Sequence, residues 1–179
     1  TWRLISESFQ NWRGMQDSGG RRIKRALHLD ATRVGYLDDD TLARLRKSRL
    51  LDKYLTQKRE DIDKWNSELG EAGQVPINQR RLTNLGTFRA YAQGYIEAHP
   101  DIHPGMTRMV RVRDPAPLGI PVEIYCFTRT TAWLEYERIQ GDIFDHLIAI
   151  LPEFGLALYQ QPAGSDFASL AHKDSAELE

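Results

Sequence analysis

The apolar side chains from residue 21 onward change their spacing several times, and the order of these changes restricts the chain to few folds. Alternation of apolar and polar residues predicts half-buried strands, and apolar residues every three or four positions predict helices. Segments rich in β-branched and aromatic residues also favour strands. The expected elements, in chain order, are a strand at 21–30, a helical region at 38–69, a helix at 84–98, strands at 106–113 and 120–128, a helix at 132–151 and a strand at 156–159.

Taken as strand, helical region, strand, strand, helix and strand, this order is that of a ferredoxin-like, split β-α-β domain. Right-handed crossovers would place both helices on one face of a four-stranded antiparallel sheet. We therefore predict an α+β fold for residues 21–162. Residues 1–20 lie outside this pattern, and we expect them to hold the last strand of a preceding β domain.

The helical region at 38–69 changes character along its length. Leucines and a tyrosine recur at helical spacing in its first half, whereas residues 57–64 are nearly all charged. We expect the helix to continue through the charged stretch, bent or broken there and partly exposed. Gly70, Gly73 and Pro76 then end it.

The composition excludes several classes of protein. No stretch approaches the roughly 18 to 20 consecutive apolar residues that a membrane-spanning helix requires, and the first residues lack the features of a signal peptide. Cys126 is the single cysteine, so no internal disulfide can form, which is typical of a reducing compartment. Because the first residue is Thr1, we expect the chain to be a piece of a longer protein.

The charges are balanced in total but unevenly distributed. The 179 residues carry 24 basic and 25 acidic side chains, a net charge of −1. Residues 1–29 hold six basic and two acidic residues, whereas residues 129–179 hold three basic and nine acidic ones. Such an asymmetry suits either nucleic-acid binding at one end or electrostatic pairing between copies of the chain.

The residues that could carry catalysis or bind a metal do not form a recognisable motif. His99 and His103 have the spacing of a zinc pair on a helix, but Pro100 and Pro104 prevent the continuous helix that such a pair needs. We expect Cys126 to be a small buried side chain rather than a nucleophile. We predict that the chain is not an enzyme and holds neither a metal nor a cofactor.

The basic N-terminal region and the ferredoxin-like order also allow an RNA-binding module. Such modules stack bases on aromatic side chains of their central strands. Tyr125 and Phe127 share one face of a strand, and Arg111 and Arg113 lie on the preceding strand. These residues match the RNA-recognition pattern in residue type only, so a soluble RNA-binding or regulatory module is the alternative interpretation.

Four segments, in order, resemble the cytoplasmic portion of the small-conductance mechanosensitive channel family, and specifically its miniconductance branch. The first contains SFQNWRGM and SGGRRIKR, which are similar to the close of that family's middle β domain and the first strand of its α/β domain. The matching segments lie at 8–25, 83–102, 119–128 and 143–156.

This resemblance implies a function that the spacing of residues does not reveal. In this family, seven subunits enclose a hollow cytoplasmic vestibule, and membrane tension opens a pore that releases ions and small solutes under osmotic stress. We therefore expect the chain to form vestibule wall on the cytoplasmic side of a bacterial inner membrane. Its expected partners are copies of itself in a heptamer, the lipid bilayer through an N-terminal membrane part, and the permeating solutes, with no nucleic acid and no cofactor.

The resemblance also divides the chain. Residues 1–20 correspond to the end of the middle β domain, residues 21–162 to the α/β vestibule domain and residues 163–179 to a mobile tail. In the prototype of the family, one helix joins the first two strands of the α/β domain, whereas 76 residues lie between them here. The helix at 84–98 is its expected equivalent, which makes residues 38–82 an insertion.

The candidate functional residues lie at the junction of the two expected domains. They are predicted to form an interdomain hinge or a subunit contact: Trp12, Arg13, Gly14, Gly19, Gly20 and Arg21. Local packing around a turn explains them equally well. If Gly20 requires a positive φ angle, a change to valine should disrupt assembly of the vestibule.

Overall fold

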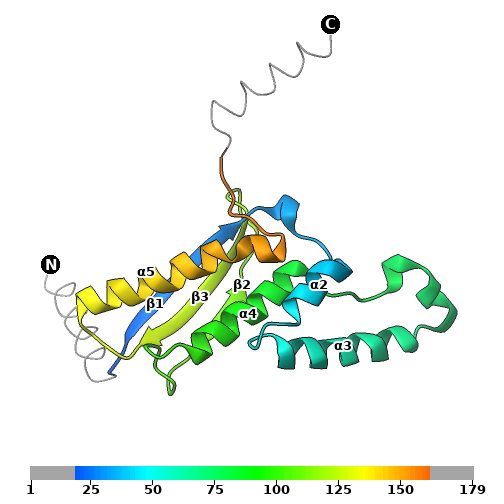
Figure 1. The fold of residues 1–179 in the computed structure, drawn as a ribbon. Helices are drawn as coiled ribbons and strands as arrows, with labels where there is room; N and C mark the ends of the chain where they lie inside the picture. Colours follow the sequence, from blue (N-terminus) through cyan, green and yellow to red (C-terminus); the bar gives the residue numbers. More distant parts are fainter. Residues whose placement is uncertain (1–18, 162–179) are drawn as a thin grey trace, which may run out of the picture.

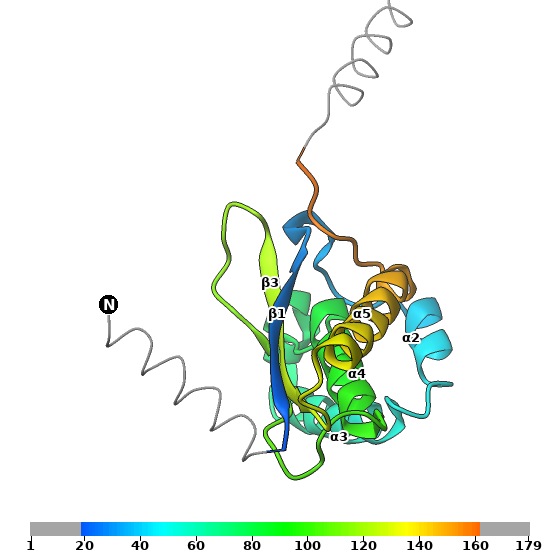
Figure 2. The ribbon, with the colours of Figure 1, turned by 90° about the vertical axis from the view of Figure 1, so that its left-hand side faces the viewer.

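In a computed structural model that describes residues 19–161, a small sheet is covered by helices on one face (Figures 1 and 2). The sheet has three strands, β1 (Arg21–Leu29), β2 (Met109–Val112) and β3 (Ile120–Thr128). β3 lies in the centre and pairs antiparallel with both neighbours. The α+β fold predicted from the sequence is confirmed.

The fourth expected strand, at 156–159, is reduced to a single bridge. Leu158 pairs antiparallel with Leu29, and the Tyr159 N–H donates a hydrogen bond to the His28 carbonyl (2.8 Å). The bridge meets β1 at its last residue, so this segment supports only the end of β1. It lies beside β1, where the ferredoxin-like order puts a fourth strand, but the sheet formed by the described residues has three strands.

Two helices, α4 (Asn84–Ala98) and α5 (Trp133–Ala149), cover one face of the sheet (Figure 2). The Thr83 hydroxyl caps α4 by accepting a hydrogen bond from the Gly86 N–H (3.1 Å), and α4 ends just before Pro100. Both helices agree with the sequence prediction. The apolar faces of the helices and the sheet form one core, whose fully buried members include Ile23, Leu29, Phe88, Ile96, Val122, Ile124, Ile143 and Leu147.

The helical region predicted at 38–69 is divided into two helices, α2 (Asp39–Leu45) and α3 (Asp52–Ser67). The break falls at residues 46–51. It does not fall in the charged stretch at 57–64, where α3 is continuous. The charged residues are therefore compatible with regular helix, and another cause must set the break.

Packing explains the position of this break. Leu51 is completely buried, and Leu50 lies against Gly94 of α4, where a Cβ atom would be 3.3 Å from the Leu50 carbonyl oxygen. The chain therefore turns where it meets α4 and not where its charge is highest. Beyond the turn, α3 extends away from the sheet, and the helical turns η2 (Gly70–Gln74) and η3 (Pro76–Asn78) lead the chain back (Figure 1).

The helices that cover the sheet are polar on their outer side. In α5, which has 17 residues, Tyr136, Ile143 and Leu147 are buried, whereas Glu135 and Arg138 are exposed. None of the helices in residues 19–161 combines the length and the apolar content that crossing a bilayer requires.

Candidate functional site

Three of the six predicted junction residues lie in the described part of the chain. Gly19 and Gly20 immediately precede β1, and Arg21 is its first residue. The other three lie outside the described residues: Trp12, Arg13 and Gly14.

The two glycines of the junction are required for different reasons. Gly19 has a φ of 70°, in the left-handed region that favours glycine. Gly20 is buried and does not have a positive φ, but a Cβ atom there would lie 2.7 Å from the Thr128 carbonyl oxygen and 2.9 Å from the Met106 sulfur. The suggestion of a positive φ at Gly20 is therefore wrong. Gly20 is needed because the end of β3 approaches its backbone closely.

Arg21 connects the start of β1 to α5. Its guanidinium lies over the ring of Tyr136, 4.4 Å from the ring centroid. The Tyr136 hydroxyl lies within hydrogen-bond distance of the Arg22 carbonyl (3.0 Å) and of Gln140 Oε1 (3.1 Å). Burial raises the pKa of Tyr136, and the charge of Arg21 opposes this rise. These contacts hold Arg21 and the start of β1 against α5 within the domain.

One face of the sheet is left uncovered by the helices of the described chain, and we call it the open face (Figure 2). Tyr125 and Phe127 form an edge-to-face pair on it, with ring centroids 5.7 Å apart and an interplanar angle of 80°. The strand register places Lys24 and Met109 opposite Tyr125 on the two neighbouring strands. From this register and the alternation of side chains, the open face comprises Arg22, Lys24, Ala26, His28, Met109, Arg111, Pro121, Glu123, Tyr125 and Phe127.

Glu123 lies in the middle of the open face and is only 5% exposed. Two guanidiniums hold its carboxylate, with Arg111 Nη2 2.6 Å from Oε1 and Arg113 Nη1 3.0 Å from Oε2. Burial acts to raise the pKa of Glu123, but the hydrogen bonds and charges of the two arginines outweigh it, so the pKa lies below its ordinary value. The sequence analysis missed Glu123. A glutamate within an apolar strand, next to a segment with arginines at positions i and i+2, is a pattern that could have indicated this ion pair.

The open face also contains an unsatisfied polar atom. The Nδ1 atom of His28 is buried and has no hydrogen-bond partner within residues 19–161. A buried nitrogen without a partner is unfavourable, by about 1–3 kcal/mol in typical cases.

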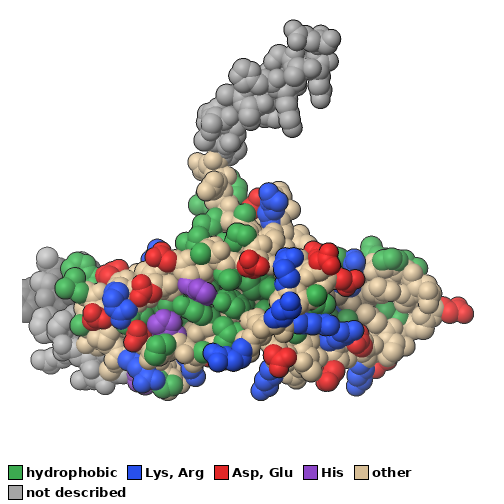
Figure 3. All heavy atoms as spheres, viewed as in Figure 1, with side chains coloured by type: hydrophobic (Ala, Val, Ile, Leu, Met, Phe, Trp, Pro, Cys, Tyr) green, Lys and Arg blue, Asp and Glu red, His purple; other side chains and the backbone are tan. Residues whose placement is uncertain are grey.

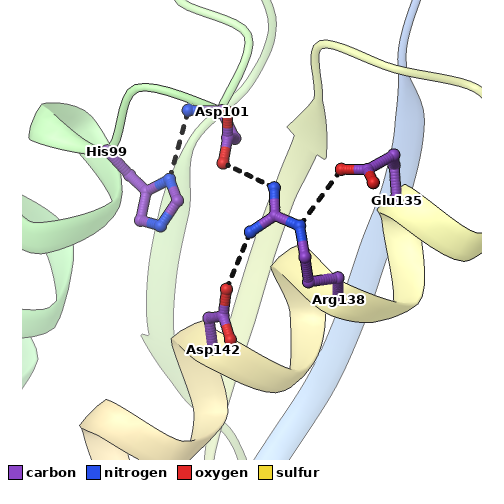
Figure 4. A network of polar contacts seen from close by, with 5 residues as sticks. All are labelled: His99, Asp101, Glu135, Arg138 and Asp142. Carbon is purple, nitrogen blue, oxygen red and sulfur yellow. Dashed lines mark hydrogen bonds and ion pairs between the residues drawn. The ribbon is translucent and has the colours of Figure 1, made fainter.

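A second set of polar contacts joins α5 to the loop after α4 (Figure 4). Arg138 contacts three carboxylates, those of Asp142 (2.9 Å), Glu135 (3.1 Å) and Asp101 (3.3 Å). These contacts raise the pKa of Arg138, and the hydrogen bond with Glu135 makes the largest contribution. Burial lowers the pKa of the neighbouring His99, against the charges of Asp101 and Asp142. Since the four ion-paired side chains are all partly or largely open to solvent, the network fixes a loop and does not form an enclosed reactive centre.

The residues considered for metal binding and for catalysis have structural roles. His99 Nδ1 accepts a hydrogen bond from the Asp101 N–H (3.2 Å), and His103 Nδ1 accepts one from the Gly105 N–H (3.1 Å). Cys126 is completely buried, as predicted, and burial raises its pKa to about 12. Within residues 19–161, no three His, Cys, Asp or Glu side chains are placed to hold a metal ion.

Comparison with known proteins gives an informative similarity. No protein-family model matches the chain. The sequence is 26% identical over 94 residues to the low conductance mechanosensitive channel YnaI of Escherichia coli (strain K12). The match covers 52% of this chain and 25% of the E. coli protein, so the chain corresponds to about a quarter of that relative's length. This similarity supports a relationship to the mechanosensitive channels and a channel-related role.

Proposed function

We propose that this chain forms part of the cytoplasmic vestibule of a mechanosensitive channel that releases ions and small solutes under osmotic stress. The observation that carries the proposal is the similarity to the E. coli channel over 94 residues. In this proposal, residues 1–20 close a middle β domain, residues 21–162 form the vestibule wall with 38–82 inserted, and residues 163–179 form a tail. The complete protein lies in a bacterial inner membrane, with this part on the cytoplasmic side, and assembles as a heptamer.

The one-sided sheet supports self-association. One face of the sheet is closed by the chain's own core, whereas the open face has charged and aromatic groups available for a neighbour. A vestibule wall needs this combination of a stable inner core and a surface that remains free for other subunits or domains.

The junction also supports a place within a multidomain subunit. Gly19 bends the chain in the left-handed region, and Gly20 then brings it close to the end of β3. Arg21 and Tyr136 fix the first residue of β1 on α5. A rigid start to β1 would transmit the position of a preceding domain to the sheet, so we propose the turn at Gly19 as the point where two domains are joined.

A chimera of the E. coli channel tests this function. The segment of that channel that matches this chain is replaced by this chain, and the chimera is expressed in cells that lack tension-gated channels. We expect an oligomer of the same size as the parent on gel filtration and currents that open under suction in excised membrane patches.

The control replaces the same segment with an unrelated α+β domain, which should abolish assembly. A chimera that inserts into the membrane but stays monomeric would contradict the proposal. Tension-gated currents from the unrelated chimera would show that the segment has no specific role.

A single-stranded RNA-binding module is the second candidate, and one observation favours it. Tyr125 and Phe127 lie together on the open face beside Lys24, as aromatic platforms for bases require. The proposal of a channel part is preferred because Arg111 and Arg113 on the same face are already engaged by the carboxylate of Glu123. Binding of mixed RNA oligonucleotides at low salt that is lost in Tyr125→Ser would support the RNA module, and no binding would exclude it.

A further inference from the structure

The segment at 38–82, which the channel proposal does not explain, forms a cavity that is open to solvent. The cavity lies between α2, α3 and the returning residues 80–82, and its volume is about 440 Å³. This volume falls within the range of roughly 300–1,000 Å³ that small-molecule sites occupy. The backbone around it is ordered by specific bonds, since the Leu37 N–H donates to the Leu82 carbonyl (2.9 Å).

Arginine dominates the polar part of the lining. Four arginines, Arg46, Arg59, Arg80 and Arg81, line the cavity together with two aspartates, Asp39 and Asp63. Arg59 is paired with Asp63 at 3.6 Å. The other three arginines make no ion pair within residues 19–161. Figure 3 shows Lys and Arg side chains over the region of α2 and α3, with Asp and Glu side chains among them. The lining therefore carries four positive and two negative side chains, a net excess of two positive charges.

Two of these arginines are held in place before any ligand arrives. The Arg81 guanidinium lies over the Tyr36 ring, 3.8 Å from its centroid, and that of Arg80 lies over the Trp65 ring at 5.3 Å. Asn66 of α3 exchanges two hydrogen bonds with the backbone of Arg80, at 2.9 and 3.0 Å. Stacking occupies the faces of a guanidinium and leaves its N–H edge free for an anion, so less entropy is lost on binding.

Apart from Asn66, the remaining lining is apolar. Leu37, Leu42, Ile62 and Leu82 contribute to it, and Ile62 is only 8% exposed. A site with an apolar floor and several preformed guanidiniums is complementary to an anion that also has an apolar body. Guanidiniums bind phosphate oxygens through paired N–H groups.

We propose that this cavity binds an organic phosphate, with the phosphate on Arg46, Arg80 and Arg81 and the carbon body on the leucines and Ile62. The phosphate belongs either to a small metabolite such as a nucleotide or to the headgroup of an anionic phospholipid. This site is independent of the channel proposal, because it rests on the insertion alone.

Calorimetric titration of the 179-residue chain with ATP and with pyrophosphate, at low salt, tests the first source. Co-sedimentation with phosphatidylglycerol vesicles, compared with phosphatidylcholine vesicles, tests the second. The double variant Arg46→Gln/Arg81→Gln removes two of the anchoring guanidiniums. The matched control, Arg49→Gln/Lys53→Gln, removes the same charge from exposed residues of the same segment that do not line the cavity.

We expect the cavity variant to bind the phosphate probe about tenfold more weakly or worse, while the control stays within about twofold of the parent chain. Circular dichroism and melting without ligand check that both variants are folded. Binding of ATP or pyrophosphate assigns a metabolite, and binding of phosphatidylglycerol alone assigns a lipid headgroup. The proposal is overturned if the parent chain binds no probe, or if the two variants weaken binding equally. Either result leaves the chimera experiment on the channel unaffected.

Discussion

Successive side chains of β3 meet two different environments. On the face covered by the helices, Val122, Ile124 and Cys126 are completely buried among apolar groups. On the open face, Glu123 is enclosed by two arginines, and Tyr125 and Phe127 are half-buried against each other. The covered face stabilises the fold through burial of apolar side chains. On the open face, neighbouring side chains form ion pairs and a ring contact with one another. The comparison teaches that one face of the sheet is sufficient to hold the fold, so the other can carry interactions with partners.

Removing a side chain from the covered face should have the largest effect. Ile124→Ala leaves a cavity at the centre of the core, and we expect a loss of about 2–5 kcal/mol in the free energy of unfolding. Urea denaturation followed by circular dichroism measures it. The same change at Ile120, a half-buried residue of the same strand and face, should cost less than half as much. Equal losses would mean that burial does not distinguish positions along the covered face.

At the junction, the end of β3 and the Met106 side chain pack closely against Gly20. The variant Gly20→Val should therefore destabilise the fold. A valine must displace the Thr128 carbonyl or the Met106 side chain, and such overpacking typically costs about 1–3 kcal/mol. Gly35→Val is the matched control, because no atom lies within 4 Å of a Cβ at that position and its φ is not positive. Unfolding curves of both variants are compared with that of the parent. If they shift equally, the close approach at Gly20 is not the cause.

Among open-face residues, Glu123 should contribute most to the free energy of unfolding, and its contribution should depend on pH. Its folded pKa lies below the unfolded one, so its contribution is fully present above the unfolded pKa and is lost as the pH falls through the folded pKa. Glu123→Gln should therefore lower stability by about 1–3 kcal/mol near neutral pH and approach the parent chain in acid. Urea denaturation at several pH values between about 3 and 7 measures the difference.

Glu153 provides the control for this pH dependence. It is exposed and has no ion-pair partner in the described chain, so Glu153→Gln should change the free energy of unfolding only slightly. A difference between Glu123→Gln and the parent chain that stays constant with pH would contradict the assignment of the lowered pKa to the two arginines.

The elements that local sequence signals determine could be predicted. Alternating and β-branched residues identified β1 and β3, and the buried position of Cys126 followed from its place in an apolar strand. For α4, the predicted start and end are observed, because Thr83 caps it and Pro100 stops it. In each case the information lies within a few residues of the element itself.

Features that depend on contacts between distant residues could not be predicted. The break at residues 46–51 is set by Gly94, more than 40 positions away, and not by the charged stretch that follows it. The need for glycine at position 20 comes from Thr128 and Met106. The fourth strand is short because the segment after α5 meets only the end of β1. The cavity in the insertion likewise requires residues from both of its ends, which no local pattern brings together.

The smallest effect on stability is expected at Tyr125, and it gives the most direct test of the open face. Tyr125→Ser removes a half-buried ring whose main aromatic contact is Phe127, so the free energy of unfolding should fall by only about 1 kcal/mol. If the open face contacts a neighbouring subunit, the same change in the complete channel should nevertheless reduce the oligomeric fraction on gel filtration. Trp133→Ser, which removes an exposed ring from the outer side of α5, should leave assembly intact. A ring that becomes fully desolvated at an interface contributes strongly to binding, so its loss should weaken a contact made there. Unchanged assembly with Tyr125→Ser would therefore show that this part of the open face is not in the subunit contact.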